Sequence, residues 1–231
     1  MFTVILDNGH GSNTLGKCSP TIDFIDTNKK ENTSISGKRF REYLFARRVV
    51  KAAIPKLKAL GYNAIQLVPE DKDISLSSRV SRINQYCKQY GAGNCVMVST
   101  HVNAAGSADK WMSARGWSIW TTKGQNNSDK LSTCIYEAAN ELLSKDQIYK
   151  STFIGEKVQK PIRTDFSDGD ADYEANFSII KGANCPATLV ENMFQDNKED
   201  VKFLESEHGF NMVVDILVNG VQKYAVKYGK K

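Results

Sequence analysis

The chain has 231 residues, of which 41% are hydrophobic and 25% are charged, and it carries a formal net charge of +5 at pH 7. This length suits one α/β domain, and the composition excludes a disordered or fibrous chain. The basic residues are scattered, so we attribute the positive charge to a solvated surface and expect no nucleic-acid partner.

Three apolar stretches rich in β-branched residues each lead into a histidine or a carboxylate. Residues 2–6 precede Asp7-Asn8-Gly9-His10-Gly11, residues 95–98 precede Ser99-Thr100-His101, and residues 187–190 precede Glu191. Unbroken apolar runs of this length are typical of strands buried on both faces of a parallel sheet. Ligands bind outside the carboxyl ends of such strands, so these side chains are placed where a site would form.

Apolar residues at helical spacing occupy the intervals between the predicted strands. Helices are predicted at about residues 37–60, 76–90, 128–142, 198–205 and 209–226, and further strands at 63–68 and 117–122. Pro55 should kink the first helix or end it early, and Ser128 can cap the third. Strands alternating with helices predict an α/β fold: a single domain over residues 1–231 with a twisted, mostly parallel sheet covered by helices on both faces.

Two histidines and a glutamate could together hold a metal ion. A catalytic Zn²⁺ takes three protein ligands, often histidines with a carboxylate, and His10, Glu42 and His101 could supply that set. Glu42 lies on the apolar stripe of the first predicted helix, where a carboxylate is unusual without a partner. Glu191 could then move a proton as general base and acid. No local spacing motif supports this set, so loop histidines, a surface Glu42 and a solvated Glu191 remain alternatives.

Four short motifs occur in order along nearly the whole chain: VILDNGHG at residues 4–11, EYLFARR at 42–48, STHVNA at 99–104 and PATLVENMF at 186–194, followed by Asn197. The set resembles the zinc-dependent N-acetylmuramoyl-L-alanine amidases of the amidase-3 type. Arg79 and Asn84 also match a helix pattern of that family. Two departures bear on substrate preference: Met193 occupies a position where the family usually has glycine, and the polar loop between His10 and Glu42 is distinctive.

The resemblance implies a site and a reaction. His10, Glu42 and His101 would bind Zn²⁺, and Glu191 would be the catalytic base and acid. The partner would be peptidoglycan or muropeptides, cleaved at the amide between N-acetylmuramic acid and L-alanine of the stem peptide. Asn103 would orient the site or contact substrate, with a structural role as the alternative, and Arg163 could meet a substrate carboxylate. We expect a monomer.

Two rival functions stay open at this stage. A zinc carboxypeptidase acting on wall peptides could use similar ligands, and a wall-binding module could have kept the fold without the reaction. The presence of Glu191 argues against the second rival, because binding alone needs no general base. The acidic loop with Asp165, Asp168, Asp170, Asp172 and Glu174 does not match the EF-hand pattern, so we interpret it as a solvated loop.

The remaining features concern the compartment in which the chain works. Five cysteines without a CxxC motif indicate neither a disulfide framework nor a zinc ribbon, and fit synthesis in a reducing compartment. No apolar run approaches the roughly 20 residues of a membrane span, so we expect no membrane insertion. No secretory leader is visible. We therefore expect a protein made in the cytoplasm that acts on the cell wall, as a phage-type lytic enzyme or after secretion with its leader removed.

Overall fold

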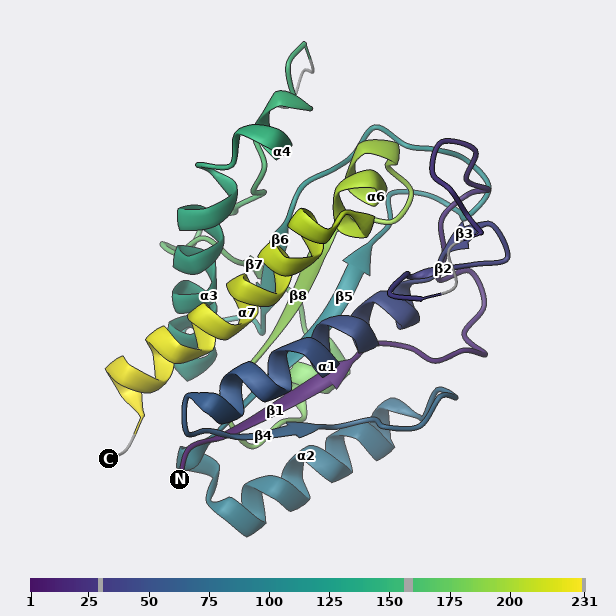
Figure 1. The fold of residues 1–231 in the computed structure, drawn as a ribbon. Coiled ribbons are helices and arrows are strands. Elements are labelled where there is room, and N and C mark those ends of the chain that lie inside the picture. Colours follow the sequence, from purple (N-terminus) through teal and green to yellow (C-terminus); the bar gives the residue numbers. More distant parts are fainter. Residues whose placement is uncertain (29–30, 156–159, 230–231) are drawn as a thin grey trace.

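The computed structural model describes residues 1–28, 31–155 and 160–229, and its centre is one six-stranded sheet (Figure 1). The strands follow the order β4-β1-β5-β8-β6-β7. All neighbouring strands are parallel except β6 and β8, which are antiparallel. The strands are β1 Thr3–Asn8, β4 Asn63–Gln66, β5 Cys95–Asn103, β6 Ser118–Thr121, β7 Tyr173–Glu174 and β8 Ala187–Phe194. The predicted, mostly parallel α/β sheet is thus confirmed.

Helices cover both faces of this sheet. They are α1 Glu42–Ala59, α2 Leu76–Tyr90, α3 Asn127–Leu143, α4 Gln147–Ser151, α5 Ser178–Lys181, α6 Lys198–Glu205 and α7 Glu207–Tyr228, with a 3₁₀ turn at Ala92–Asn94. Side chains alternate along β1, so Val4 and Leu6 join the core with α1, α3 and α7, whereas Ile5 joins the core with α2 and α5. Figure 1 shows α1 and α7 on one side of the sheet and α2 on the other.

The central strands extend beyond the apolar runs that predicted them. The first strand continues through Asn8, the central strand through Asn103 and the last strand through Phe194. His101 and Glu191 therefore lie within strands rather than after them. The expected ends were too early because apolar runs mark only the part of a strand that is buried in the core, whereas backbone pairing continues through the polar residues of the site.

The first helix begins later than predicted, at Glu42. Residues 35–40 instead form a hairpin of strands β2 Ile35–Ser36 and β3 Arg39–Phe40, which turns at Gly37 and Lys38. Both turn residues have positive φ, 59° and 57°, as two-residue hairpin turns require. Pro55 does not end the helix, which continues to Ala59. The early end predicted from Pro55 was wrong: the buried side chains of Ala53 and Leu57 hold this segment against the core.

The cap of the third helix lies two residues earlier than predicted. Asn126 accepts a hydrogen bond from Ser128 N at 2.8 Å and forms a capping box with Asp129. Ser128 is not the cap, because its hydroxyl accepts from Ala187 N at the start of β8. In the stretch 150–181, the described residues outside α4, β7 and α5 are irregular. No helix in the described part of the chain is long and apolar enough to cross a bilayer.

Candidate metal centre

Three polar side chains from separate elements meet at the carboxyl ends of the central strands. His10 follows β1, Glu42 opens α1 and His101 lies in β5, and each offers a ligand atom within 4.8 Å of the other two. Glu42 Oε1 lies 2.9 Å from His101 Nδ1 and 3.4 Å from His10 Nε2. The two imidazole rings are nearly perpendicular, with centroids 4.9 Å apart. The structure therefore brings together the three residues predicted from sequence as metal ligands.

Glu42 is buried but remains a carboxylate. Its side chain is 1% exposed, Val102 N donates to its Oε1 at 3.1 Å, and its Oε2 has no hydrogen-bond partner among the described residues. Burial alone would raise the pKa of Glu42, but hydrogen bonds with His10 and His101 outweigh it and hold that pKa well below its ordinary value. An ionised carboxylate with an unpaired oxygen beside two imidazoles is a donor set that fits Zn²⁺.

Glu191 stands next to this group without belonging to it. It lies opposite His101 in the register of β5 and β8, and its Oε2 is buried without a hydrogen-bond partner in the described ranges. Burial raises the pKa of Glu191 to about 8; the charge of His101 opposes this rise and that of Glu42 adds to it. A carboxyl group whose pKa is close to neutrality can both take up and release a proton.

Two arginines hold the backbone of His10 in an uncommon conformation. His10 has a φ of 62°, in the left-handed region that few non-glycine residues adopt. Its carbonyl oxygen accepts hydrogen bonds from Arg47 Nη1 at 3.1 Å and from Arg79 Nη2 at 3.3 Å. Arg79 also donates to Asn8 O at 3.0 Å and pairs with the buried carboxylate of Asp7. The imidazole is thus positioned by two guanidinium groups that act on its backbone.

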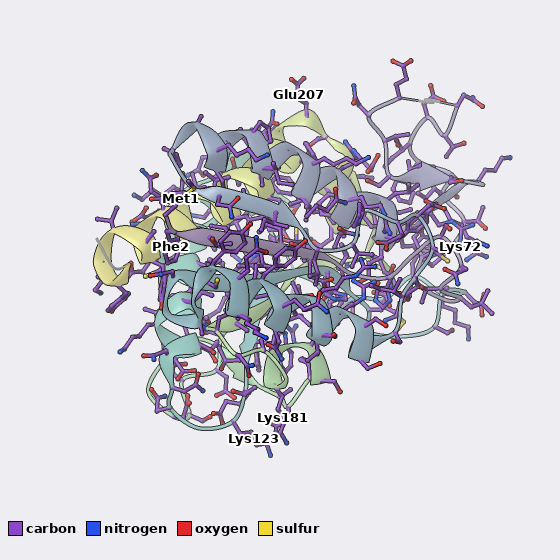
Figure 2. The ribbon with its side chains drawn as sticks, turned by 90° about the horizontal axis from the view of Figure 1, so that it is seen from below. Met1, Phe2, Lys72, Lys123, Lys181 and Glu207 are labelled. Carbon is purple, nitrogen blue, oxygen red and sulfur yellow. The ribbon has the colours of Figure 1, made fainter. Side chains whose placement is uncertain are left out.

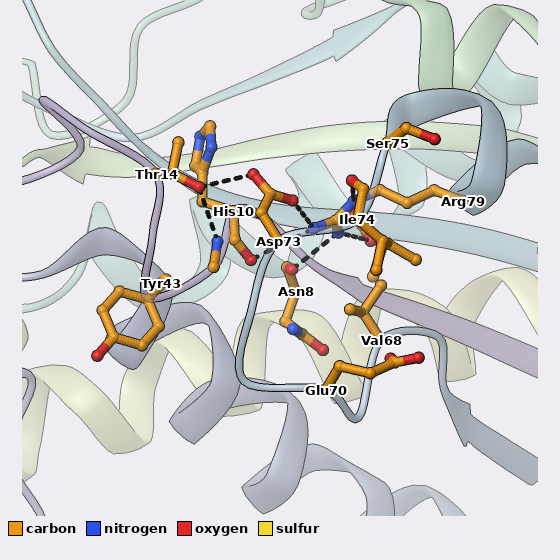
Figure 3. Close-up of polar contacts among 12 residues, drawn as sticks. Asn8, His10, Thr14, Tyr43, Val68, Glu70, Asp73, Ile74, Ser75 and Arg79 are labelled. Atoms are coloured by element: carbon orange, nitrogen blue, oxygen red, sulfur yellow. Dashed lines mark hydrogen bonds and ion pairs between the residues drawn. The ribbon is translucent and has the colours of Figure 1, made fainter.

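The loop after His10 is tied to the loop before α2 through the same network (Figure 3). Asp73 Oδ1 accepts from Arg79 Nη2 at 2.7 Å, and Asp73 Oδ2 accepts from the hydroxyl of Thr14 at 2.6 Å. The Thr14 hydroxyl in turn accepts from Gly11 N at 3.0 Å. Sequence reasoning noted Arg79 only as part of a family pattern and missed the positioning roles of Asp7, Arg47 and Asp73. The charged Asp7 at the end of an apolar run was the feature of the sequence that could have indicated a buried partner such as Arg79.

The two residues predicted to contact substrate lie at the same end of the sheet. The side-chain oxygen of Asn103 accepts from Ala104 N at 2.8 Å, so part of this side chain shapes the turn after β5. The guanidinium carbon of Arg163 lies 5.4 Å from the ring centroid of Phe194. Phe194 pairs with Asn103 in the register of β5 and β8, which places Arg163 beside the last residues of the central strands.

The remaining histidine, two of the tryptophans and the cysteines have structural surroundings. His208 is paired with Asp146 at 2.6 Å on the surface and does not belong to the group of His10, Glu42 and His101. Trp117 is fully buried, and Trp120 stacks on Tyr173 with ring centroids 4.7 Å apart. All five cysteines are buried free thiols.

Comparisons with known proteins point to one protein family. The family model for N-acetylmuramoyl-L-alanine amidase matches residues 4–223. The N-acetylmuramoyl-L-alanine amidase AmiC of Neisseria meningitidis serogroup B is 26% identical over 244 residues, covering 96% of this chain and 52% of the relative. The chain thus spans about half the length of that curated relative.

Solved structures share the fold over nearly the whole chain. The N-acetylmuramoyl-L-alanine amidase from Clostridium difficile 630 has a TM-score of 0.70 at 21% identity, covering 99% of this chain and 98% of that one. The amidase AmiC2 of Nostoc punctiforme has a TM-score of 0.68 at 17% identity, with 97% of each chain covered. At this identity the structures establish the fold. The family match over residues 4–223 shows that the chain belongs to the amidase-3 family of N-acetylmuramoyl-L-alanine amidases.

Proposed function

We propose that the chain is a zinc-dependent peptidoglycan hydrolase that cleaves the amide between N-acetylmuramic acid and L-alanine of the stem peptide. One observation carries the proposal. The donor atoms of His10, Glu42 and His101 converge, while the buried carboxyl of Glu191 faces the same space from the next strand. Membership of an amidase family supports the assignment of the bond that is cleaved. A metal ion that polarises the carbonyl and a separate group that carries the proton can together catalyse amide hydrolysis.

The three proposed ligands and Glu191 have distinct tasks in the proposed reaction. His10, Glu42 and His101 would hold the zinc ion, which supplies a Lewis acid that polarises the scissile carbonyl and acidifies water. Glu191 would take the proton from the attacking water on a carboxyl oxygen and deliver it to the leaving amine nitrogen. Burial raises the pKa of Glu191, which makes its carboxylate a stronger base towards the attacking water.

A pocket beside the two histidines could accommodate part of the substrate. Its volume is about 320 Å³, and it lies between the start of α2 and α5. The lining away from the ligands includes Asp73, Ile74, Leu76 and Ile179. Because Asp73 is already paired with Arg79 and Thr14, the pocket favours an uncharged group. Asn103 and Arg163, at the ends of the neighbouring strands, would contact polar groups of the wall polymer.

The proposed substrate implies the partner of the enzyme and the place where it acts. Peptidoglycan or its muropeptide fragments would be its partner, and it would act at the cell wall. The helices of the described residues pack on one central six-stranded sheet, which supports a single catalytic domain over residues 1–231. A monomer suffices for the proposed reaction, because all four residues of the site come from one chain.

Product analysis on purified peptidoglycan tests the reaction type. The zinc-loaded protein is expected to release peptides with a new N-terminal L-alanine and to leave glycan strands with free lactyl carboxyl groups. Release of a C-terminal residue from the stem peptide would instead identify a carboxypeptidase. Binding to the wall without any new amino termini would identify a wall-binding module, and either result would refute the proposed function.

A further inference from the structure

Apart from the metal centre, three carboxylates converge at another place in the fold. Asp129, Asp170 and Asp172 each offer an oxygen within 4.8 Å of the other two. Asp129 lies in the first turn of α3, beside Ser128, which binds the amino end of β8, whereas the metal centre lies at the carboxyl ends of the strands. Figure 2 shows the two ends of the sheet, with Met1 and Phe2 at the amino end and Lys72 at the carboxyl end.

None of the three carboxylates in this group has a cationic partner among the described residues, unlike several other buried carboxylates of the chain. Asp7 pairs with Arg79, Asp200 with Arg115 and Glu205 with Arg48. In residues 1–28, 31–155 and 160–229, no lysine, arginine or histidine forms an ion pair with Asp129, Asp170 or Asp172. Three carboxylates at this spacing repel one another unless a cation or protons neutralise them.

Asp172 has an unpaired oxygen in this group. Its residue is 2% exposed, and its Oδ1 accepts from the Thr121 hydroxyl at 2.6 Å. Its Oδ2 is buried and has no hydrogen-bond partner in the described part of the chain. Withdrawing a carboxylate oxygen from water without a partner is costly, so an unpaired oxygen in a residue of this converging group indicates a missing positive charge.

The protonation behaviour of the group agrees with that geometry. The pKa of Asp172 is raised to about 7, chiefly by burial; the hydroxyls of Thr121 and Ser132 oppose this rise, and the charge of Asp170 adds to it. Burial also raises the pKa of Asp129, and Asp170 adds to that shift. A cation would replace these costs with an attraction.

We propose that Asp129, Asp170 and Asp172 bind a divalent cation of the hard, oxygen-preferring class, with Ca²⁺ as the ion that fits best. The donors are carboxylates only, which disfavours zinc and other metals that select nitrogen or sulfur. Ca²⁺ accepts six to eight oxygens in irregular geometry, whereas Mg²⁺ demands a nearly ideal octahedron. Water would complete the coordination, because Asp170 is partly exposed.

Such an ion would join two segments that are distant in sequence. Asp170 and Asp172 belong to the loop that runs from Arg163, beside the last residues of the central strands, to β7, and Asp129 belongs to α3. Gln125, just before α3, already donates from Nε2 to Asp168 at 3.2 Å and to Asp170 at 3.0 Å. The cation would strengthen this connection and fix the far end of the loop that carries Arg163.

Terbium luminescence and thermal melts test the site without relying on hydrolysis. Tb³⁺ substitutes for Ca²⁺ and emits when an excited aromatic ring is close; Tyr173 follows Asp172 and stacks on Trp120 at 4.7 Å. The zinc-loaded wild-type protein is expected to sensitise Tb³⁺, and excess Ca²⁺ should quench that emission. In chelator-free buffer, Ca²⁺ at about 100 times its Kd should raise Tm by about 5 °C relative to NaCl of equal ionic strength.

The substitutions D170N and D168N form a matched pair. Both residues accept from Gln125 Nε2, but only Asp170 belongs to the converging group. D168N should behave as wild type, whereas D170N should lose at least about 90% of the Tb³⁺ emission and the Ca²⁺-dependent rise in Tm. D170N should also melt higher than wild type in the absence of Ca²⁺, because it removes one of three repelling charges. A Ca²⁺ response equal to that of NaCl, or one retained in D170N, would overturn the proposal.

Discussion

His101 and Glu191 lie directly opposite each other on the neighbouring parallel strands β5 and β8. Just beyond this pair the register shifts, so that Asn103 pairs with Phe194, and the side chain of Asn192 donates to His101 O at 3.0 Å. The proposed zinc ligand and the proposed proton carrier are therefore fixed relative to each other by two central strands. Strands position a site more closely than loops do, because their backbone hydrogen bonds and buried side chains limit displacement.

Arg79→Ala should destabilise the protein and weaken zinc binding. Arg79 and its partner Asp7 are both buried, so the substitution leaves an uncompensated carboxylate, at a cost of about 3–5 kcal/mol. It also removes a donor from the His10 carbonyl, which should lower zinc affinity by about 10–100-fold. Denaturant unfolding and competition with a chromophoric chelator measure the two effects.

Arg82→Ala is the control on the same helix. Arg82 pairs with Glu70 at the surface and donates to Leu67 O, without reaching the metal centre. Its loss should cost no more than about 1 kcal/mol and leave zinc affinity unchanged. Equal effects of the two substitutions on zinc affinity would contradict the positioning role of Arg79.

Gly9→Ala should displace His101. A Cβ atom at Gly9 would lie 2.2 Å from His101 Cε1, closer than any real contact, so the imidazole has to move. Because zinc ligation demands donor positions within a few tenths of an ångström, we expect at least about a tenfold loss of zinc affinity. Gly106→Ala is the control, since its Cβ would meet only the flexible end of Met112. Unchanged zinc affinity in Gly9→Ala would refute the close approach of Gly9 to the His101 ring.

Met193 offers a test of backbone strain in β8. It has a φ of 66° and is completely buried, at the position where the family usually has glycine. The positive φ explains the family's preference, because glycine adopts this conformation without a steric cost. Met193→Ala should cost about 2–5 kcal/mol through lost packing, with the strain retained.

Met193→Gly should be about 1 kcal/mol more stable than Met193→Ala, because it relieves the left-handed backbone. In ordinary strands the order is reversed, since alanine is favoured over glycine. Chemical denaturation of both variants decides the point. If the alanine variant is the more stable, the conformation assigned to residue 193 is wrong.

The stability of the calcium-free protein should fall as the pH rises from about 5 to 8. Burial and the charge of Asp170 raise the pKa of Asp172 from its ordinary 3.8 to about 7 in the folded state. Between these two values the folded chain binds more protons than the unfolded chain, so this contribution is complete below pH 4 and lost as the pH passes 7. Melts of wild type and Asp170→Asn should show a steeper decline for wild type. Parallel curves of Tm against pH for the two proteins would contradict Asp172 as the source of this pH dependence.

Much of the fold could be predicted because burial leaves a direct mark in the sequence. Apolar runs located β1, β5 and β8, and helical spacing located α2 and α6 with their observed bounds. The hairpin at residues 35–40 was missed, because its turn places Lys38 at positive φ and no glycine marks that position. Strand ends were misjudged for a related reason: site residues are polar although they continue the pairing.

The candidate site could be assembled in part for the same physical reason. His10, His101 and Glu191 follow apolar runs in the sequence, and Glu42 breaks an apolar stripe, so each stands out against its neighbours. Arg47 and Asp73 could not be recognised, since a charged residue in a sequence does not reveal whether it contacts solvent or a backbone carbonyl. Asp129 was missed because it approaches Asp170 and Asp172 only through the packing of α3.

The central claim is tested most directly by zinc content and peptidoglycan hydrolysis of the wild type beside Glu191→Ala. Both proteins are expected to hold one zinc ion each, because Glu191 lies outside the ligand set. Release of N-terminal L-alanine should fall by about 10²–10⁴-fold in the variant, the usual contribution of a general acid and base. A wild type that binds no zinc, or a variant that hydrolyses as fast as the wild type, would contradict the account.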